Sequence, residues 1–119
     1  MPKQHLDPSE LFPSRQYGFS QVVTARGGTT VYVSGQVGWD ERQALRNVET
    51  ALHAAGGRLS DVVSMRIYVV PGRMEESRAI REALLEFFPD EPPTTTWIGV
   101  HSLADKDFLV EIEPIAVIE

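Results

Sequence analysis

Apolar and polar residues alternate along several short stretches of the chain, which is the period of a strand with one buried face. The stretch 62–70 shows it most clearly, because every second residue from Val63 to Val69 is apolar. β-branched and aromatic residues mark further strands at 19–25, 29–37, 94–103 and 107–119. The turn residues at 26–29 predict that the first two of these strands form a β-hairpin.

Two stretches instead carry apolar residues three and four positions apart, as one face of a helix does. In 41–55 this face contains Leu45, Val48 and Leu52, and the glycines at 56 and 57 supply a helix stop. In 74–88 the apolar face contains Ile80, Ala83, Leu84 and Phe87, and three prolines follow within five residues. The predicted order of elements is therefore β-β-α-β-α-β-β.

This order predicts an α+β sheet with two helices on one face. Residues 1–16 contain three prolines among polar residues and are expected to form a surface arm without regular structure. Residues 17–119 are expected to form a single domain. The strands carry apolar residues in both alternating sets, so the uncovered sheet face is partly apolar, and we expect it to form an interface in a homo-oligomer.

Composition excludes several classes of function. The 119 residues include no cysteine, which excludes a disulfide framework, a thiolate metal site and a thiol nucleophile. The formal net charge of −6 gives no basic patch for a nucleic acid. No apolar stretch approaches the about 20 residues of a membrane-spanning helix. We therefore expect a cytoplasmic protein with no metal, membrane or nucleic-acid partner.

Few residues carry recognisable chemistry. The three histidines, His5, His53 and His101, share no metal-ligand or dyad spacing, and the common nucleophile and phosphate-binding motifs are absent. Glu111 and Glu113 lie two residues apart in the last strand, so both face the same way and must be solvated, paired or functional. Pro114 cannot donate a ladder hydrogen bond, which predicts a bulge or a free edge beside it.

Several blocks in a fixed order resemble the RidA family, also called the YjgF or L-PSP endoribonuclease family. They are SGQV at 34–37, the helix 42–56, the strand start 61–69, the segment FFPDEPPTTTWIGV at 87–100 and the closing VEIEPIAVI at 110–118. The resemblance covers about Phe19 to Ile118. It implies a chorismate-mutase-like fold and a homotrimer whose sheets line a barrel, with small-molecule clefts between subunits.

Members of that family hydrolyse reactive imines and enamines to 2-oxo acids and ammonia without a cofactor, so the resemblance implies this activity. By position, Glu111 matches the family's water-positioning glutamate and Gly35 the glycine that lines the cleft. Phe19 stands where relatives usually have a cleft tyrosine, so it keeps the wall without the hydroxyl.

The family's arginine for the substrate carboxylate is missing, because Thr95 takes its place. A hydroxyl lacks both the charge and the fork geometry of a guanidinium. Trp97 occupies a position that is often small in relatives and would narrow the cleft. Arg81 in the second helix aligns with a polar cleft position, and our hypothesis is that it supplies the lost charge for a small carboxylate. The alternative is an exposed Arg81 paired with Glu82, Glu86 or another carboxylate.

Relatives place a longer loop between the SGQ strand and the first helix than the few residues between Gln36 and Arg42. Either this connection is truly shortened, or a mobile loop is absent from the numbered chain. The sequence thus supports two functions. One is an imine or enamine deaminase with Glu111 as its general base or water holder. The other is a noncatalytic small-molecule-binding or regulatory trimer, which the loss of arginine at Thr95 favours. A ribonuclease is disfavoured by the acidic charge.

Overall fold

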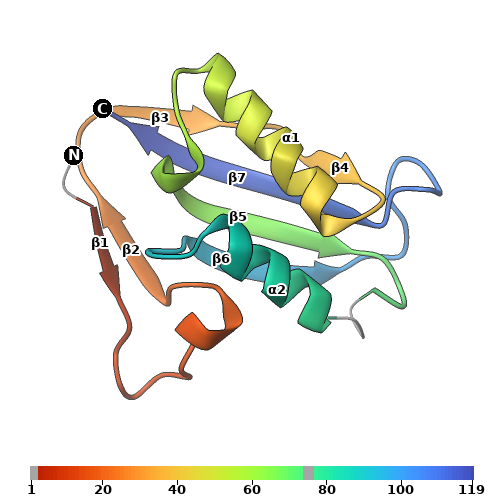
Figure 1. The fold of residues 1–119 in the computed structure, drawn as a ribbon, viewed down its shortest axis with the longest axis horizontal. Helices are drawn as coiled ribbons and strands as arrows, with labels where there is room; N and C mark the ends of the chain where they lie inside the picture. Colours follow the sequence, from red (N-terminus) through yellow and green to blue (C-terminus); the bar gives the residue numbers. More distant parts are fainter. Residues whose placement is uncertain (1–2, 74–76) are drawn as a thin grey trace.

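The computed structural model describes residues 3–73 and 77–119. It contains a five-stranded main sheet with two α-helices packed on it and a separate two-stranded sheet (Figure 1). The elements in chain order are β1 (Lys3–Leu6), η1 (Arg15–Tyr17), β2 (Val22–Ala25), β3 (Thr29–Tyr32), β4 (Gln36–Gly38), α1 (Glu41–Ala54), η2 (Leu59–Asp61), β5 (Val62–Val69), α2 (Ser77–Phe87), β6 (Thr94–Gly99) and β7 (Val110–Ile118). The first three residues of the second predicted helix, 74–76, lie outside the described residues.

Strand β7 is the centre of the main sheet. It pairs antiparallel with β5 on one side and with β3 and β4 on the other, and β6 pairs parallel with β5 at the far edge. The two partners on the β3 side cover Ile115–Ile118 and Val110–Ile112, so the ladder on this side is interrupted opposite Glu113 and Pro114. This break is what the missing N–H of Pro114 predicts.

Both helices lie on the same face of this sheet, so the predicted α+β architecture is confirmed (Figure 1). The core lies between the helices and the sheet. It includes Leu45 and Leu52 of α1, Leu84 of α2, and Ile67 and Ile112 of the two central strands, all buried. The residues between these along β5 and β7 face the other way, and the described helices leave that face of the sheet uncovered.

The predicted hairpin of the first two sequence-marked strands is wrong. β2 pairs with β1 in a separate two-stranded sheet, whereas β3 pairs with β7. The glycine turn at 27–28 passes close to the end of β7, because a Cβ on Gly28 would stand 2.3 Å from the Ile118 carbonyl oxygen. Alternation predicts a strand but not its partner, since every open strand edge offers the same backbone donors and acceptors.

The amino-terminal segment is also more regular than its prolines predict. Lys3–Leu6 forms β1, and 15–17 form a short 3₁₀ helix. β1 pairs with β2, and this pairing supplies backbone hydrogen bonds that could not be predicted from composition. The expectation of an arm without regular structure is therefore wrong for these residues.

The connection from β4 to α1 consists of Trp39 and Asp40 alone. Asp40 is the N-cap, and its carboxylate accepts a hydrogen bond of 2.8 Å from the Gln43 backbone N–H. A Cβ on Gly38 would come within 2.9 Å of both Asp40 and Ala44 backbone atoms, so this sharp entry into the helix requires glycine. The short link predicted between Gln36 and Arg42 is thus a closed, capped turn.

Candidate functional site: a cavity beside the second helix

A cavity of about 510 Å³ lies where the amino-terminal segment, the start of α2 and the edge strand β6 meet. Its lining residues are Phe12, Tyr17, Phe19, Ser77, Arg78, Arg81, Thr95 and Trp97. A volume of this order is typical of small-molecule sites. Four of the residues singled out from sequence, Phe19, Arg81, Thr95 and Trp97, are therefore brought together here.

Aromatic side chains form one wall of the cavity. The Phe12 and Tyr17 rings stack with centroids 5.1 Å apart. The short helix that carries Tyr17 packs closely on α2, because a Cβ on Gly18 would stand 2.8 Å from Leu84 Cβ, and Gly18 has a φ of 90°. Only glycine combines that close approach with that backbone conformation. The tight contact fixes Tyr17 against α2.

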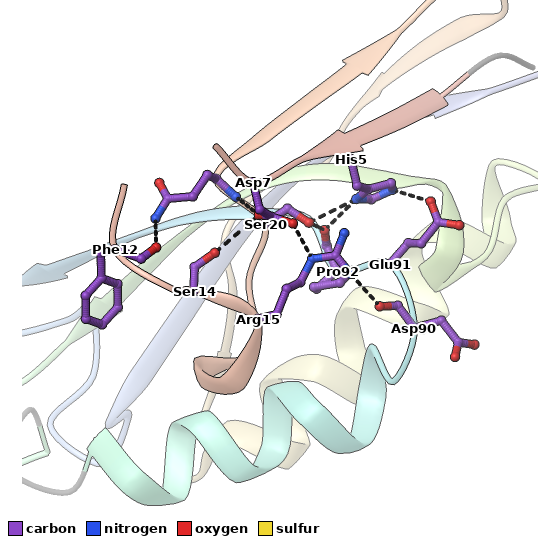
Figure 2. Close-up of polar contacts among 10 residues, drawn as sticks. His5, Asp7, Phe12, Ser14, Arg15, Ser20, Asp90, Glu91 and Pro92 are labelled. Atoms are coloured by element: carbon purple, nitrogen blue, oxygen red, sulfur yellow. Dashed lines mark hydrogen bonds and ion pairs between the residues drawn. The ribbon is translucent and has the colours of Figure 1, made fainter. Parts of the chain in front are cut away.

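A network of polar contacts holds the segment that bears these rings (Figure 2). The Asp7 carboxylate accepts a hydrogen bond from the Gln21 backbone N–H at 2.9 Å and pairs with Arg15 at 2.8 Å. Gln21 in turn donates to the Phe12 carbonyl oxygen at 2.8 Å. These contacts position the loop from 7 to 21 over the cavity.

His5 anchors the same segment to the chain that enters β6 (Figure 2). Its side chain is 2% exposed, and its Nδ1 lies 3.0 Å from both the Pro92 carbonyl oxygen and Ser20 Oγ. Because a carbonyl only accepts, Nδ1 carries the proton and Nε2 faces Glu91 at 3.3 Å. Burial lowers the pKa of His5, and the negative charge of Glu91 opposes that effect only in part.

Arg81 provides a positive charge at the cavity. Its guanidinium carbon lies 5.2 Å from the centroid of the Tyr17 ring, a cation–π contact. It forms no ion pair with any described residue, and Glu86, one of its expected partners, pairs with Arg42 at 3.1 Å instead. The guanidinium N–H groups of Arg81 therefore remain available to an anion.

Thr95 and Trp97 lie on the helix-covered face of β6, because they pair in register with Met65 and Ile67 of the core. Within the described part of the chain, neither the Thr95 hydroxyl nor the Trp97 ring N–H has a hydrogen-bond partner, although both are shielded from solvent. A buried polar group without a partner is destabilising by about 1–3 kcal/mol. Such groups are retained in native structures for a reason, and here both belong to cavity-lining residues.

Glu111 and Gly35 lie elsewhere, on the uncovered face of the sheet. Glu111 pairs in register with Val37 and Tyr68. It lies directly over Gly35, where an added Cβ would stand 2.0 Å from Glu111 Oε2. The Glu111 carboxylate makes no hydrogen bond or ion pair with the described residues, whereas Glu113 accepts from the Tyr68 hydroxyl at 3.2 Å and pairs with Arg66 at 3.6 Å.

The predicted site residues thus form two groups on opposite faces of one sheet. Phe19, Arg81, Thr95 and Trp97 line the cavity, and Gly35 and Glu111 face away from it. Sequence reasoning missed Phe12, Tyr17 and Arg78. Phe12 lies in the proline-rich stretch that was expected to form a surface arm. A large aromatic residue in such a polar stretch is the sequence feature that could have indicated its role.

The described residues contain no group of three or more potential metal ligands. His53, on α1, and His101, after β6, are both exposed. No described helix is long and apolar enough to cross a bilayer.

The fold and the cavity define a class: a small α+β domain with one uncovered sheet face and a small-molecule-sized cavity beside its second helix. The chain matches the model of the family described as Endoribonuclease L-PSP over residues 11–118. It belongs to that family, the RidA/YjgF family that the sequence blocks resemble.

Named relatives cover most or all of the chain. A 2-iminobutanoate/2-iminopropanoate deaminase of Dermatophagoides farinae is 32% identical, with 100% of both chains covered. The Rid-family protein YyfB of Yersinia pestis, a crystal structure, is 30% identical with a TM-score of 0.90, covering 99% of this chain and 100% of that one. The structure of Escherichia coli TdcF with bound serine is 28% identical with a TM-score of 0.69, covering 80% and 85%.

Proposed function

We propose that this protein hydrolyses 2-imino acids to 2-oxo acids and ammonia, in a cleft that two copies of the chain build together. The observation that carries the proposal is the Arg81 guanidinium at the aromatic cavity, which has no ion-pair partner among the described residues. The chain is also related over its full length to an imine deaminase. A guanidinium suits the carboxylate of such a substrate.

A second copy is needed because Glu111 and the cavity occupy opposite faces of the same sheet. The uncovered face that bears Glu111 also carries Ile98, Ile115 and the 78% exposed Tyr32. An apolar face of this kind is suited to association. We propose a homotrimer, in which Glu111 and Gly35 of one copy close the cavity of its neighbour.

In this cleft the Arg81 side chain holds the substrate carboxylate, and the aromatic wall excludes bulk water. The Glu111 carboxylate holds a water and accepts its proton as the water oxygen bonds to the imine carbon. Glu111 passes this proton to the imine nitrogen, which gives a carbinolamine. The hydroxyl proton of the carbinolamine then moves to the nitrogen as the carbon–nitrogen bond breaks, so that ammonia leaves and the 2-oxo acid forms. The reaction consumes one water and requires no cofactor.

Ammonia release from 2-iminopropanoate generated in situ tests the proposal. We expect Glu111→Gln to lower kcat by about 10²-fold or more, as general acid–base groups do. Arg81→Gln is expected to raise KM, because it removes a contact to the carboxylate. The matched controls are Glu82→Gln and Arg46→Gln, exposed residues outside the proposed cleft. Normal ammonia release by Glu111→Gln contradicts the proposed role of this residue.

A noncatalytic binding or regulatory trimer is the second candidate, and the threonine at position 95 favours it. This function predicts that wild-type protein binds a small carboxylate through Arg81 but does not accelerate ammonia release from any imine. Measuring both carboxylate binding and ammonia release for the wild type therefore distinguishes the two functions.

A further inference from the structure

The cavity is more aromatic than a small aliphatic substrate requires. Phe12, Tyr17, Phe19 and Trp97 supply four aromatic side chains around a volume of about 510 Å³. The side chain of a two- or three-carbon aliphatic acid is too small to contact several of these rings at once. Aromatic walls of this kind bind planar apolar groups.

A second wall of the cavity is positively charged. Arg78 and Arg81 are three residues apart in the first part of α2, so they lie on one side of the helix. Neither makes an ion pair with the described residues, and the first turn of α2 contains no acidic residue. Two neighbouring guanidiniums without an ion-pair partner among the described residues favour an anionic ligand.

The two walls are joined by direct contact. The Tyr17 ring stacks on Phe12 and also receives the Arg81 guanidinium at 5.2 Å. Phe12 is 57% exposed, yet the hydrogen bond from Gln21 to its carbonyl oxygen and the contacts of Asp7 hold its backbone in place (Figure 2). A ring held in position beside a cation loses little conformational entropy when a ligand packs on it.

We propose that the cavity selects 2-imino acids whose side chain is aromatic, with the carboxylate at Arg81 and the ring packed against Phe12 and Trp97. The inference rests on the proposed function, because it names the substrate class of the same site. Phe12 is a specificity-determining residue in this arrangement, and it contacts the ring of the ligand but not its carboxylate.

Binding of the stable 2-oxo acid products tests the inference without requiring turnover. Isothermal titration of the full chain compares phenylpyruvate with pyruvate. We expect phenylpyruvate to bind at least about tenfold more tightly, and Phe12→Ala to remove about tenfold of that preference, the size of an aromatic pair. Pyruvate affinity is expected to change less than twofold in this variant.

Leu11→Ala is the matched control, because Leu11 is also an exposed apolar residue of the same loop but does not line the cavity. It is expected to leave both affinities unchanged. Arg81→Gln is expected to weaken both acids by the same factor, since both have a carboxylate.

Equal affinity for the two acids overturns the proposed selectivity. It does not bear on the proposed hydrolysis, which the assay of ammonia release tests separately. Failure of both acids to bind also overturns the selectivity. Selective binding of phenylpyruvate without ammonia release from any imine supports the aromatic site and overturns the hydrolysis. A preference that Phe12→Ala does not change contradicts the role given to this residue.

Discussion

Glu111 and Glu113 show how neighbours decide the role of a residue. They lie two positions apart in β7 and share the uncovered sheet face. Glu113 contacts both Arg66 and the Tyr68 hydroxyl, which satisfy its carboxylate. Glu111 lies over Gly35, and its carboxylate has no hydrogen-bond or ion-pair partner among the described residues. The one free carboxylate of the pair is therefore the better candidate to hold a water.

Gly35→Ala tests this arrangement. The added methyl would overlap Glu111 Oε2 and also approach its Cγ within 2.8 Å, so the whole side chain must move. A displacement of about 1 Å costs up to about 10²-fold in rate. We expect kcat for 2-iminopropanoate to fall by about 10²-fold while the thermal unfolding midpoint changes little, because the Glu111 side chain is flexible.

Ser34→Ala is the control for that change, since the neighbouring side chain is exposed. An unchanged kcat in Gly35→Ala would show that the position of Glu111 does not matter to the reaction.

At the scale of elements, the amino-terminal segment forms part of the cavity that we propose as the site. β1 and β2 form a small sheet of their own, and the loop between them carries Phe12 and Tyr17 to the cavity. The buried His5 side chain joins β1 to Pro92, two residues before β6 begins. The stability of this attachment therefore affects both the aromatic wall and the strand that bears Trp97.

The lowered pKa of His5 predicts the pH dependence of stability. The native state holds the ring neutral, whereas the unfolded chain takes a proton as the pH falls below the ordinary value of 6.5. The contribution of His5 to the free energy of unfolding is therefore fully present above pH 6.5 and is lost as the pH falls through the native pKa of this residue. Chemical unfolding at pH 7.5 and pH 5 should show this loss.

The comparison with His5→Gln isolates this effect from other titrating groups. The free energy of unfolding of His5→Gln is expected to fall less between pH 7.5 and pH 5 than that of the wild type. The exposed residue His53 supplies the control, because His53→Gln is expected to lose as much stability as the wild type. Equal loss in wild type and His5→Gln would exclude His5 as the cause.

At the scale of the whole molecule, the sheet has one covered and one uncovered face. The covered face holds the core, and the other presents Glu111 together with apolar side chains such as Ile98 and Ile115. One chain therefore carries two parts of the proposed site, and these parts cannot meet within it. Association of copies is the arrangement that brings them together, and the trimer stays a prediction of this argument.

Ile115→Asp should disrupt that association. Ile115 is partly exposed on the uncovered face at the middle of β7, so the substitution places a charge in the proposed interface without entering the core. We expect analytical ultracentrifugation to show a trimer for the wild type and mostly monomer for the variant.

Leu85→Asp is the matched control, because Leu85 is an exposed apolar residue on α2. A wild-type monomer, or an Ile115→Asp variant that remains trimeric, would contradict the proposed interface.

The sequence by itself determined most of the elements and the family. Helical spacing in α1 and α2, alternation in β5 and the blocks around Gly35 and Trp97 are local patterns, and local patterns follow from the geometry of a single helix or strand. Even the break beside Pro114 could be predicted, because it depends on one missing N–H. The cytoplasmic location stays a prediction.

Only the tertiary structure decided which strands pair and which residues meet. β2 joins β1 and not β3, and this places Phe12 and Tyr17 at the cavity. It also separated Glu111 from Arg81 by the thickness of the sheet, although the sequence suggested one cleft. Strand edges are chemically alike, so their partners follow from the packing of the whole chain and cannot be read from the period of any one segment.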